Sequence, residues 1–369
     1  MSIREIGPYN RENMKTKVSI IIPIYNAMPY LTECLDSVSN QSYRHKEVLL
    51  INNGSTDNSL AVCREYEKRF DFVRTFNVES KSIGAARNYG LEKSSGDLIM
   101  FIDADDYLPG KDVLSMLVKK ITASQTDICV GNYCRLWNGK LLHATSHRAF
   151  SRYPQNKLSF LFTGFFSVDV LSYVWAKLYR KDFIVGHGLS FSNSRYAEDK
   201  LFNLQAAAFG AKYSFLNNEI YVHRHNLLSV SNSYRHNPHY IWIQIAEELK
   251  DTFKDGTIPK IWKKMIAYTI FFGCFFDCKM EYYHHNRTLN KVNELLSKYG
   301  ENPLCRESFI LLSNVFNLHG IPSFMYKILI GGFAWAMRLH LYPLLALAIK
   351  LLVECKIDEL LSDTGRKPK

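Results

Sequence analysis

The sequence predicts an α/β protein with a mostly parallel sheet flanked by helices, followed by a C-terminal helical region. Near-continuous apolar runs at 18–24 and 98–102 have the length and composition of strands buried on both faces. Segments with apolar residues at helical spacing alternate with these runs through short connections, which favours right-handed βαβ units. From about residue 237 the pattern is helical throughout.

Composition and charge narrow the class of protein. The 369 residues are 47% hydrophobic and 14% aromatic, which is typical of a globular protein with a substantial core. The formal net charge of +11 suits nucleic acid, anionic lipid or a phosphorylated substrate equally well. Because no Lys/Arg-rich block or nucleic-acid-binding signature accompanies this charge, we expect no nucleic-acid partner.

The N-terminus and the cysteines indicate a cytoplasmic protein. Residues 1–17 are polar and lack the apolar segment of a secretory signal, so we interpret them as an N-terminal extension. None of the eight Cys combines metal-binding spacing with a His partner. We therefore expect reduced thiols that fill small core positions.

The first hundred residues contain four predicted strands with helices between them. A helix is predicted over 28–41, a second after Ser55-Thr56-Asp57, whose side chains suit a helix N-cap, and a third from Gly84, where small residues let the backbone approach a ligand. The predicted strands are 18–24, 47–51, 72–76 and 98–102.

The acidic turn Asp103-Ala104-Asp105-Asp106 directly follows the last of these strands. Open α/β sheets bind their ligands at the carboxyl ends of the strands, where this turn lies. Clustered acids repel one another, and a hard divalent metal that holds a phosphorylated ligand would compensate them. The alternative is a solvated turn, in which Asp is common.

Three polar loops, 52–57, 84–88 and 103–106, adjoin what would be the same edge of the sheet. Together they suit a nucleotide diphosphate, with polar groups for base and ribose, Arg87 for phosphate and acids for a bridging metal. No Gly-x-Gly-x-x-Gly fingerprint follows the first strand and no Walker-type loop is present, which disfavours a nicotinamide enzyme or a P-loop NTPase.

Four stretches in this order and spacing resemble the family 2 glycosyltransferases, in the branch that builds bacterial surface and capsular polysaccharides. They are Ser19-Ile-Ile-Ile-Pro-Ile-Tyr-Asn26, Ile51-Asn-Asn-Gly-Ser-Thr-Asp57, Gly84-Ala-Ala-Arg-Asn88 and Phe101-Ile-Asp-Ala-Asp-Asp106. Weaker similarity continues through 174–179, 196–199 and 221–231. The resemblance implies the Rossmann-like GT-A fold, with a catalytic domain over 18–236 that divides into a nucleotide-binding half, 18–108, and an acceptor half, 109–236.

The resemblance also implies roles for individual residues. Asp103 would hold the ribose, Asp105 a Mn or Mg ion, and Arg87 the diphosphate. The family usually has an acid at the position of Asn53, so this amide makes base preference less certain, although an amide can both donate and accept. The residues implied to line the base and ribose pocket are Pro23, Tyr25, Asn26, Asn53 and Asp57.

Inverting transfer needs a base that deprotonates the incoming hydroxyl. The resemblance over 196–199 implies that Asp199 is this base. The alternative is that Glu198 and Asp199 only favour a helix N-terminus. Glu198 and Lys177 are further candidates to contact the nucleotide sugar, although a Lys beside aromatics is often a surface side chain. His223 is a candidate metal ligand on a strand. Surface positions are predicted for His236, His239, His284 and His285.

The C-terminal region, 237–369, is predicted to contain helices at 241–253, 261–278 and 289–299, and two short amphipathic helices within 324–353. The uninterrupted apolar pieces of 324–353 fall short of the ~20 residues that cross a bilayer. Peripheral membrane contact through this segment is our expectation. A dimer interface, giving a homo-oligomer, or a cap on the catalytic domain is the alternative.

The sequence thus predicts an inverting, metal-dependent transferase that moves a sugar from a UDP-sugar to a saccharide acceptor. We expect the acceptor to be lipid-linked and the protein to lie in the cytoplasm at the inner face of a bacterial membrane. The alternatives are a dTDP-sugar donor or a catalytically silent nucleotide-sugar-binding subunit. Joint retention of Asp103, Asp105 and Asp199 argues against the second alternative.

Overall fold

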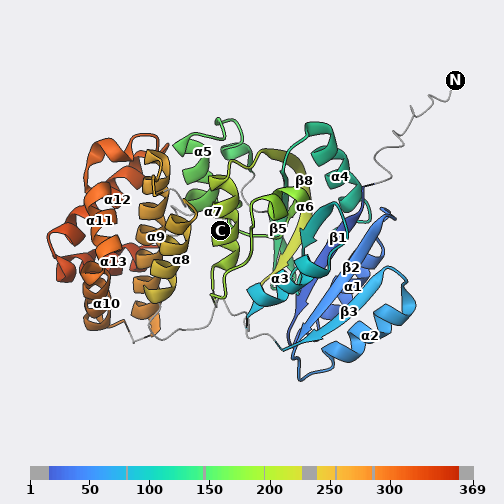
Figure 1. The fold of residues 1–369 in the computed structure, drawn as a ribbon. Helices are drawn as coiled ribbons and strands as arrows, with labels where there is room; N and C mark the ends of the chain where they lie inside the picture. The colour runs from blue at the N-terminus through green and yellow to red at the C-terminus, as the bar shows by residue number, and fades with distance from the viewer. Residues whose placement is uncertain are drawn as a thin grey trace. The chain divides into compact units, whose positions relative to one another are not determined.

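The computed structural model describes residues 16–79, 82–143, 147–194, 196–226, 239–253, 256–284 and 287–356 (Figure 1). The chain divides into two compact units that exchange segments along the sequence. Unit 1 comprises Met1–His143, Val174–Asn193 and Ala211–Asn226, and unit 2 comprises Ala144–Tyr173, Ser194–Gly210 and Leu227–Lys369. The catalytic domain predicted over 18–236 therefore contains unit 1 together with segments of unit 2.

Unit 1 is built on an eight-stranded sheet with the order β3-β2-β1-β4-β7-β5-β6, in which β8 also pairs with β5. The pairs β1/β2, β1/β4, β2/β3 and β5/β8 are parallel, whereas β7 is antiparallel to β4 and β5, and β6 to β5. The predicted α/β class with a mostly parallel sheet is confirmed. The strands are β1 (Val18–Ile24), β2 (Lys46–Asn53), β3 (Val73–Val78), β4 (Leu98–Phe101), β5 (Ile128–Trp137), β6 (Lys140–His143), β7 (Lys177–Arg180) and β8 (Tyr213–Arg224).

Strand β1 lies inside the sheet, between β2 and β4. All seven of its residues are buried, as the continuous apolar run predicts. Helix α3 packs on β1 and β2. At Gly90 a Cβ would lie 2.4 Å from the Ile21 side chain, so only glycine permits this approach. Ser82 caps α3 by accepting a hydrogen bond from the Ala85 N–H. The helices of unit 1 are α1 (Leu31–Ser39), α2 (Ser59–Arg69), α3 (Ile83–Lys93), α4 (Val113–Ser124) and α6 (Lys181–Gly186).

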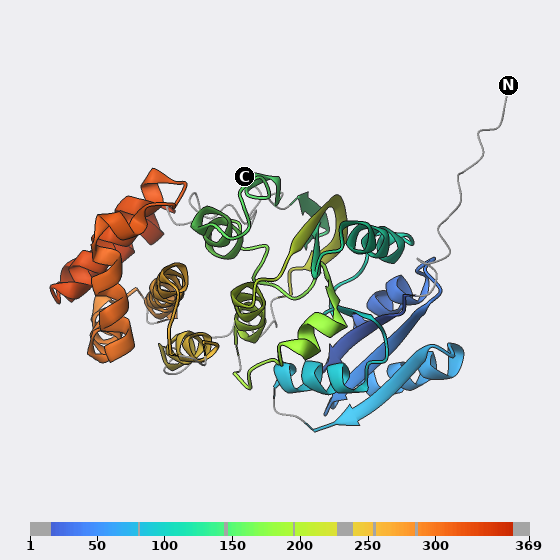
Figure 2. The same ribbon diagram turned by 45° about the horizontal axis from the view of Figure 1, so that its top comes forward.

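Unit 2 is helical in its described residues, and Figure 2 shows its C-terminal helices end-on and side-on. The predicted helical character of the C-terminal region is confirmed. A helix at Pro303–Ser313 is not among the predicted helices, because proline usually interrupts a helix. With Asn302 as N-cap, Pro303 is instead the favoured first residue of a helix. The α-helices are α5 (Leu158–Phe162), α7 (Glu198–Ala208), α8 (His239–Asp251), α9 (Lys260–His284), α10 (Leu289–Glu301), α11 (Pro303–Ser313), α12 (Phe324–Arg338) and α13 (Tyr342–Glu354). Short turns are η2 (His147–Ala149), the π-helical η3 (Thr163–Ser167) and η5 (Val315–Leu318).

Two predictions about small groups of residues are corrected. His239 was expected at the surface, but it is buried and its ring lies 6.0 Å from that of Tyr299. His284 is exposed as predicted, whereas His236 and His285 lie outside the described residues. Seven cysteines are buried thiols as expected, but Cys355 is exposed.

Candidate functional site

The acidic turn after β4 is organised by Asp106, the most buried of its three acids. One Asp106 carboxylate oxygen, Oδ2, accepts a hydrogen bond from the Tyr221 hydroxyl at 2.7 Å, and Oδ1 accepts one from the Arg224 N–H at 2.7 Å. Its backbone N–H donates to the Asp103 carbonyl. Asp106 therefore fastens the turn to β8. Sequence reasoning assigned it no role, because residues more than a hundred positions away supply its partners.

Asp105 lies next to Asp106 and is affected by the negative charge of its carboxylate. Its Oδ2 accepts a hydrogen bond from Asn226 at 3.2 Å, and its carbonyl accepts one from Arg224 Nε at 3.0 Å. Burial, and then the charges of Asp106 and Asp103, raise the pKa of Asp105 to about 6. An ionised Asp105 is thus costly without a cation, so this donor set fits a hard divalent metal. Within the described residues no three His, Cys, Asp or Glu side chains converge as a protein-only metal site.

His223 faces Asp106, with its Nδ1 3.2 Å from Oδ2, and its ring stacks on Trp175 at 5.2 Å. Burial opposes protonation, but the charge and hydrogen bond of Asp106 raise the pKa of His223. A metal would have to meet this imidazole through Nε2. His223 as a metal ligand stays a prediction.

The Arg87 guanidinium forms an ion pair with Asp103, its Nη2 2.9 Å from Oδ1. Arg87 is buried, and its Cζ lies 5.3 Å from the centre of the Phe191 ring. The Asp103 backbone N–H donates to the Tyr221 hydroxyl at 3.1 Å. Asp103 is therefore fixed from two sides, with its carboxylate partly open to solvent. The sequence predicts that Arg87 contacts the diphosphate. In the structure Arg87 also pairs with Asp103, which is itself a predicted site residue.

The loops after β1 and β2 brace each other through two predicted site residues. Asn26, with a φ of 47°, accepts hydrogen bonds on Oδ1 from the backbone N–H groups of Thr56 at 2.8 Å and Asp57 at 3.3 Å. In return Asp57 Oδ2 accepts from the Met28 N–H at 3.1 Å. Partial burial opposes ionisation, but the bonds from Ser59 and Met28 lower the pKa of Asp57. Both side chains thus shape the loops.

The remaining predicted residues of the base pocket differ in exposure. Pro23 is buried within β1, where it pairs with Ile51, whereas the Tyr25 side chain is 64% exposed. Asn53 closes β2, and its Nδ2 donates to the Ser82 carbonyl at 3.4 Å, at the start of α3. Tyr25 is the residue of this group with room to meet a planar ligand.

Lys177 is completely buried on β7, paired in register with Val130. The alternative of an exposed side chain with a solvated head is therefore wrong. Trp175, two residues earlier, stacks on Tyr221 with ring centroids 4.9 Å apart and an angle of 9°. This stack links the Lys177 segment to the tyrosine that holds the acidic turn.

The acidic pair at the start of α7 belongs to unit 2. Glu198 is buried, whereas Asp199 is half-buried and its Oδ1 accepts a hydrogen bond from the Lys200 N–H at 2.7 Å. The alternative that both acids favour a helix N-terminus agrees with this bond, but such a role does not require burial of Glu198.

Two buried polar residues hold α7 in place, and sequence reasoning missed both. Lys200 Nζ donates to the Phe165 carbonyl at 2.7 Å and pairs with Asp169 at 3.0 Å. Asn203 Nδ2 donates to the carbonyls of Ser172 and Tyr173, each at 3.1 Å. These bonds fix the first turn of α7, and hence Asp199, against the 165–173 segment.

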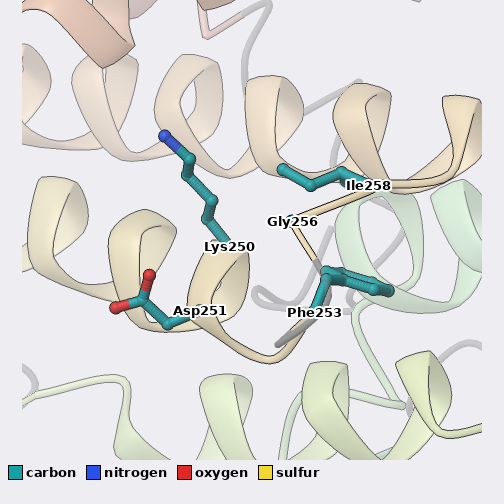
Figure 3. A pocket seen from close by; sticks show the side chains of 5 residues that line it. All are labelled: Lys250, Asp251, Phe253, Gly256 and Ile258. Atoms are coloured by element: carbon teal, nitrogen blue, oxygen red, sulfur yellow. The ribbon is translucent and has the colours of Figure 1, made fainter.

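A hollow of about 290 Å³ lies elsewhere in unit 2, where α8 ends (Figure 3). None of the predicted site residues lines it, and its charged lining groups among the described residues are one Lys and one Asp. We do not assign the active site to it. Its lining residues are Lys250, Asp251, Phe253, Gly256 and Ile258.

Residues 19–182 match the family model described as Glycosyl transferase family 2. EpsH of Bacillus subtilis is 30% identical over 224 residues, which are 59% of this chain and 63% of EpsH. The cholesterol galactosyltransferase of Borreliella burgdorferi is 28% identical over 227 residues, 59% of this chain and 63% of that protein. The chain thus matches less than two thirds of the length of either relative.

Among solved structures, residues 1–349 of S. aureus TarS in complex with UDP-GlcNAc superpose with a TM-score of 0.68 at 19% sequence identity. The likeness covers 92% of this chain and 92% of that one. It confirms the predicted GT-A fold followed by helices.

Proposed function

We propose that the protein is a family 2 glycosyltransferase, whose family model residues 19–182 match, and that it transfers a sugar from a nucleotide sugar to a saccharide acceptor. The proposal depends chiefly on one observation, the pair of partly open carboxylates Asp103 and Asp105 at the carboxyl end of β4. A UDP-sugar is the proposed donor, since the TarS structure contains UDP-GlcNAc. A dTDP-sugar is the alternative, because Asn53 replaces the usual acid.

At the donor, each residue has a proposed task set by its contacts. Asp103, oriented by Arg87 and Tyr221, accepts hydrogen bonds from the ribose hydroxyls. Asp105 holds a Mn or Mg ion, which when bound neutralises charge on the leaving diphosphate. The raised pKa of Asp105 supports this role, because a cation would relieve the repulsion that raises it. Tyr25 contacts the base, while Asn26 and Asp57 keep its loop in shape.

We propose that Asp199 takes the proton from the attacking hydroxyl, so that transfer proceeds with inversion. A half-buried carboxylate on a fixed helix turn suits this task, because it can be oriented without being fully desolvated. Lys200 and Asn203 supply that orientation by holding α7. Glu198 and Lys177 are proposed to contact the nucleotide sugar.

The acceptor is proposed to be a lipid-linked saccharide at the inner face of a bacterial membrane, in polysaccharide biosynthesis. One relative is named as a cholesterol galactosyltransferase, and this name supports an acceptor that belongs to a membrane. The domain boundary near residue 236 also remains part of the proposal. A silent nucleotide-sugar-binding subunit is the alternative, and the three retained acids argue against it.

A panel of nucleotide sugars, with and without Mn and Mg, tests the proposal by thermal stabilisation and by release of nucleoside diphosphate. We expect one donor to stabilise the protein only when metal is present. Asp105→Asn should abolish this stabilisation, whereas Asp71→Asn, at an exposed turn, should leave it intact. No response to any donor, or undiminished release in a chelator, would rule out the metal-dependent reaction.

A further inference from the structure

Large apolar side chains are exposed mainly in one part of unit 2. Of the eighteen such exposed residues in the described chain, twelve lie between Ile310 and Leu351. Helix α12 of this segment packs against both α11 and α13, which Figure 1 shows in orange and red. Soluble surfaces rarely gather apolar side chains in this way without a partner.

On α12 the exposed apolar residues form one stripe opposite the buried face. Phe324, Ile328 and Trp335 of α12 and its C-cap residue Leu339 are separated by four, seven and four residues, so they fall on the same side of the helix, and exposed Met325 lies next to Phe324. The buried residues, which include Ile330, Phe333 and Met337, occupy the other side. Phe324 is 75% and Trp335 54% exposed.

Helix α13 repeats this arrangement after the connection 339–341, which contains exposed Leu339 and Leu341. Its exposed residues are Leu344, Leu347 and Leu351, whereas Leu345 and Ile349 are buried. A further apolar point stands at η5, next to α11 and α12, where Phe316 is 82% exposed. We call the exposed residues of η5, α12 and α13 the apolar face.

The charged residues of the segment 308–353, which carries the apolar face, have one sign, and exposed Glu354 directly follows the segment at the end of α13. No Asp or Glu occurs between Glu307 and Glu354. The segment contains Lys327, Arg338 and Lys350, of which Arg338 is exposed and the two Lys are half-buried. An isologous dimer would set this face against its own copy, so cations would meet cations and no acid within 308–353 would pair them. A partner that is apolar and anionic complements the face better.

We infer that the apolar face binds an anionic lipid bilayer, with α12 and α13 lying in the plane of its headgroups. Each helix combines an apolar stripe with Lys or Arg beside it, which is the pattern of interfacial helices. The 15 residues of α12 extend about 22 Å, less than a hydrocarbon core of about 30 Å. No helix of the described chain is both long and apolar enough to span a membrane.

Sedimentation with vesicles tests this inference on the full chain and needs neither donor nor acceptor, so it is independent of the proposed reaction. We expect binding to phosphatidylcholine vesicles that contain phosphatidylglycerol, with much weaker binding to phosphatidylcholine alone. The variant Phe324→Ser/Trp335→Ser/Leu344→Ser should lower the partition coefficient at least ~10-fold, because each removed side chain would be buried in lipid. Lys327→Gln/Arg338→Gln/Lys350→Gln should lower it about tenfold or more and flatten its salt dependence.

The matched control is Leu141→Ser/Val185→Ser, which removes two equally exposed apolar side chains from unit 1. It should bind vesicles as the unaltered protein does. All variants change exposed or half-exposed side chains, and circular dichroism verifies their folding. Failure of the unaltered chain to bind the anionic vesicles, or an equal loss in the control, overturns the inference. A dimer that the triple Ser variant dissociates, with vesicle binding unchanged, would instead assign the face to a second copy.

Discussion

The acidic turn of unit 1 and the first turn of α7 in unit 2 both place carboxylates at the end of a secondary-structure element, but they hold them differently. In the acidic turn, buried Asp106 accepts bonds from Tyr221 and Arg224. In α7, Asp199 is half-buried, and buried Lys200 and Asn203 fix the helix around it. Burial with several donors marks an acid that maintains structure, whereas a partly open acid on a braced element is available for chemistry.

The largest effect should follow removal of the structural acid. Asp106→Ala leaves the buried Tyr221 hydroxyl and Arg224 N–H without their acceptor, so we expect a loss of ~3–5 kcal/mol in the free energy of unfolding. Urea denaturation followed by tryptophan fluorescence measures it. Asp71→Ala, at an exposed turn, should change the midpoint little. An Asp106→Ala midpoint that matches the unaltered protein would remove Asp106 from its structural role.

Substitution of Asp199 should lower turnover and leave stability nearly unchanged, in contrast to substitution of Asp106. Asp199→Asn retains the size of the side chain but cannot accept a proton, so turnover should fall at least ~100-fold with donor affinity and stability nearly unchanged. Steady-state rates and calorimetric donor titration separate the two quantities. Asp182→Asn, in the first turn of α6, is the matched control. If donor binding and turnover fell together, another residue would have to be the base.

The contrast also shows how far sequence reasoning reaches. Local patterns located the strands of the first hundred residues within a few positions, and the acidic turn at their edge, because apolar runs and turn residues act over short distances. The partners of that turn could not be found in this way. Tyr221 lies 115 residues from Asp106, and β7 and β8 enter the sheet from segments that alternate with unit 2.

Sequence patterns were weakest for polar residues with buried partners. Lys177 and Lys200 are buried, although lysine usually indicates a surface. Pro303 begins a helix because Asn302 caps it. In each case tertiary contacts or a neighbouring cap overrides the average behaviour of the residue type.

Glu47 in unit 1 is an acid whose contribution to stability should depend on pH. It accepts hydrogen bonds from Lys17, Ser19 and Ser95, and although burial opposes them, these bonds lower its pKa to about 2. The stabilisation is complete above pH 4.5, the ordinary value, and is lost as the pH falls toward 2. Glu47→Gln should cost ~1–2 kcal/mol at neutral pH.

Urea denaturation at several pH values measures this effect. The unaltered protein should lose stability more steeply than Glu47→Gln as the pH falls below 4.5. Glu65→Gln, exposed on α2, should follow the unaltered curve. Parallel curves for the Glu47→Gln and unaltered proteins would mean that Glu47 keeps an ordinary pKa.

The smallest effect compares two buried tyrosines, one in each unit. The Tyr221 hydroxyl donates to Asp106 and accepts from the Asp103 N–H, whereas the buried Tyr268 hydroxyl on α9 has no hydrogen-bond partner among the described residues. Tyr221→Phe leaves a buried carboxylate and a buried N–H short of one bond each, so we expect a loss of ~1–2 kcal/mol. Tyr268→Phe removes a hydroxyl that gains nothing from burial, so stability should stay level or rise by up to ~1 kcal/mol. Each variant loses one hydroxyl oxygen from a buried tyrosine. The difference between their urea midpoints therefore measures the contribution of the Tyr221 hydrogen bonds to stability. Equal midpoints would show that the Tyr221 bonds contribute no net stability, and the acidic turn would then depend on its other contacts, which include those of Arg224 and Asn226.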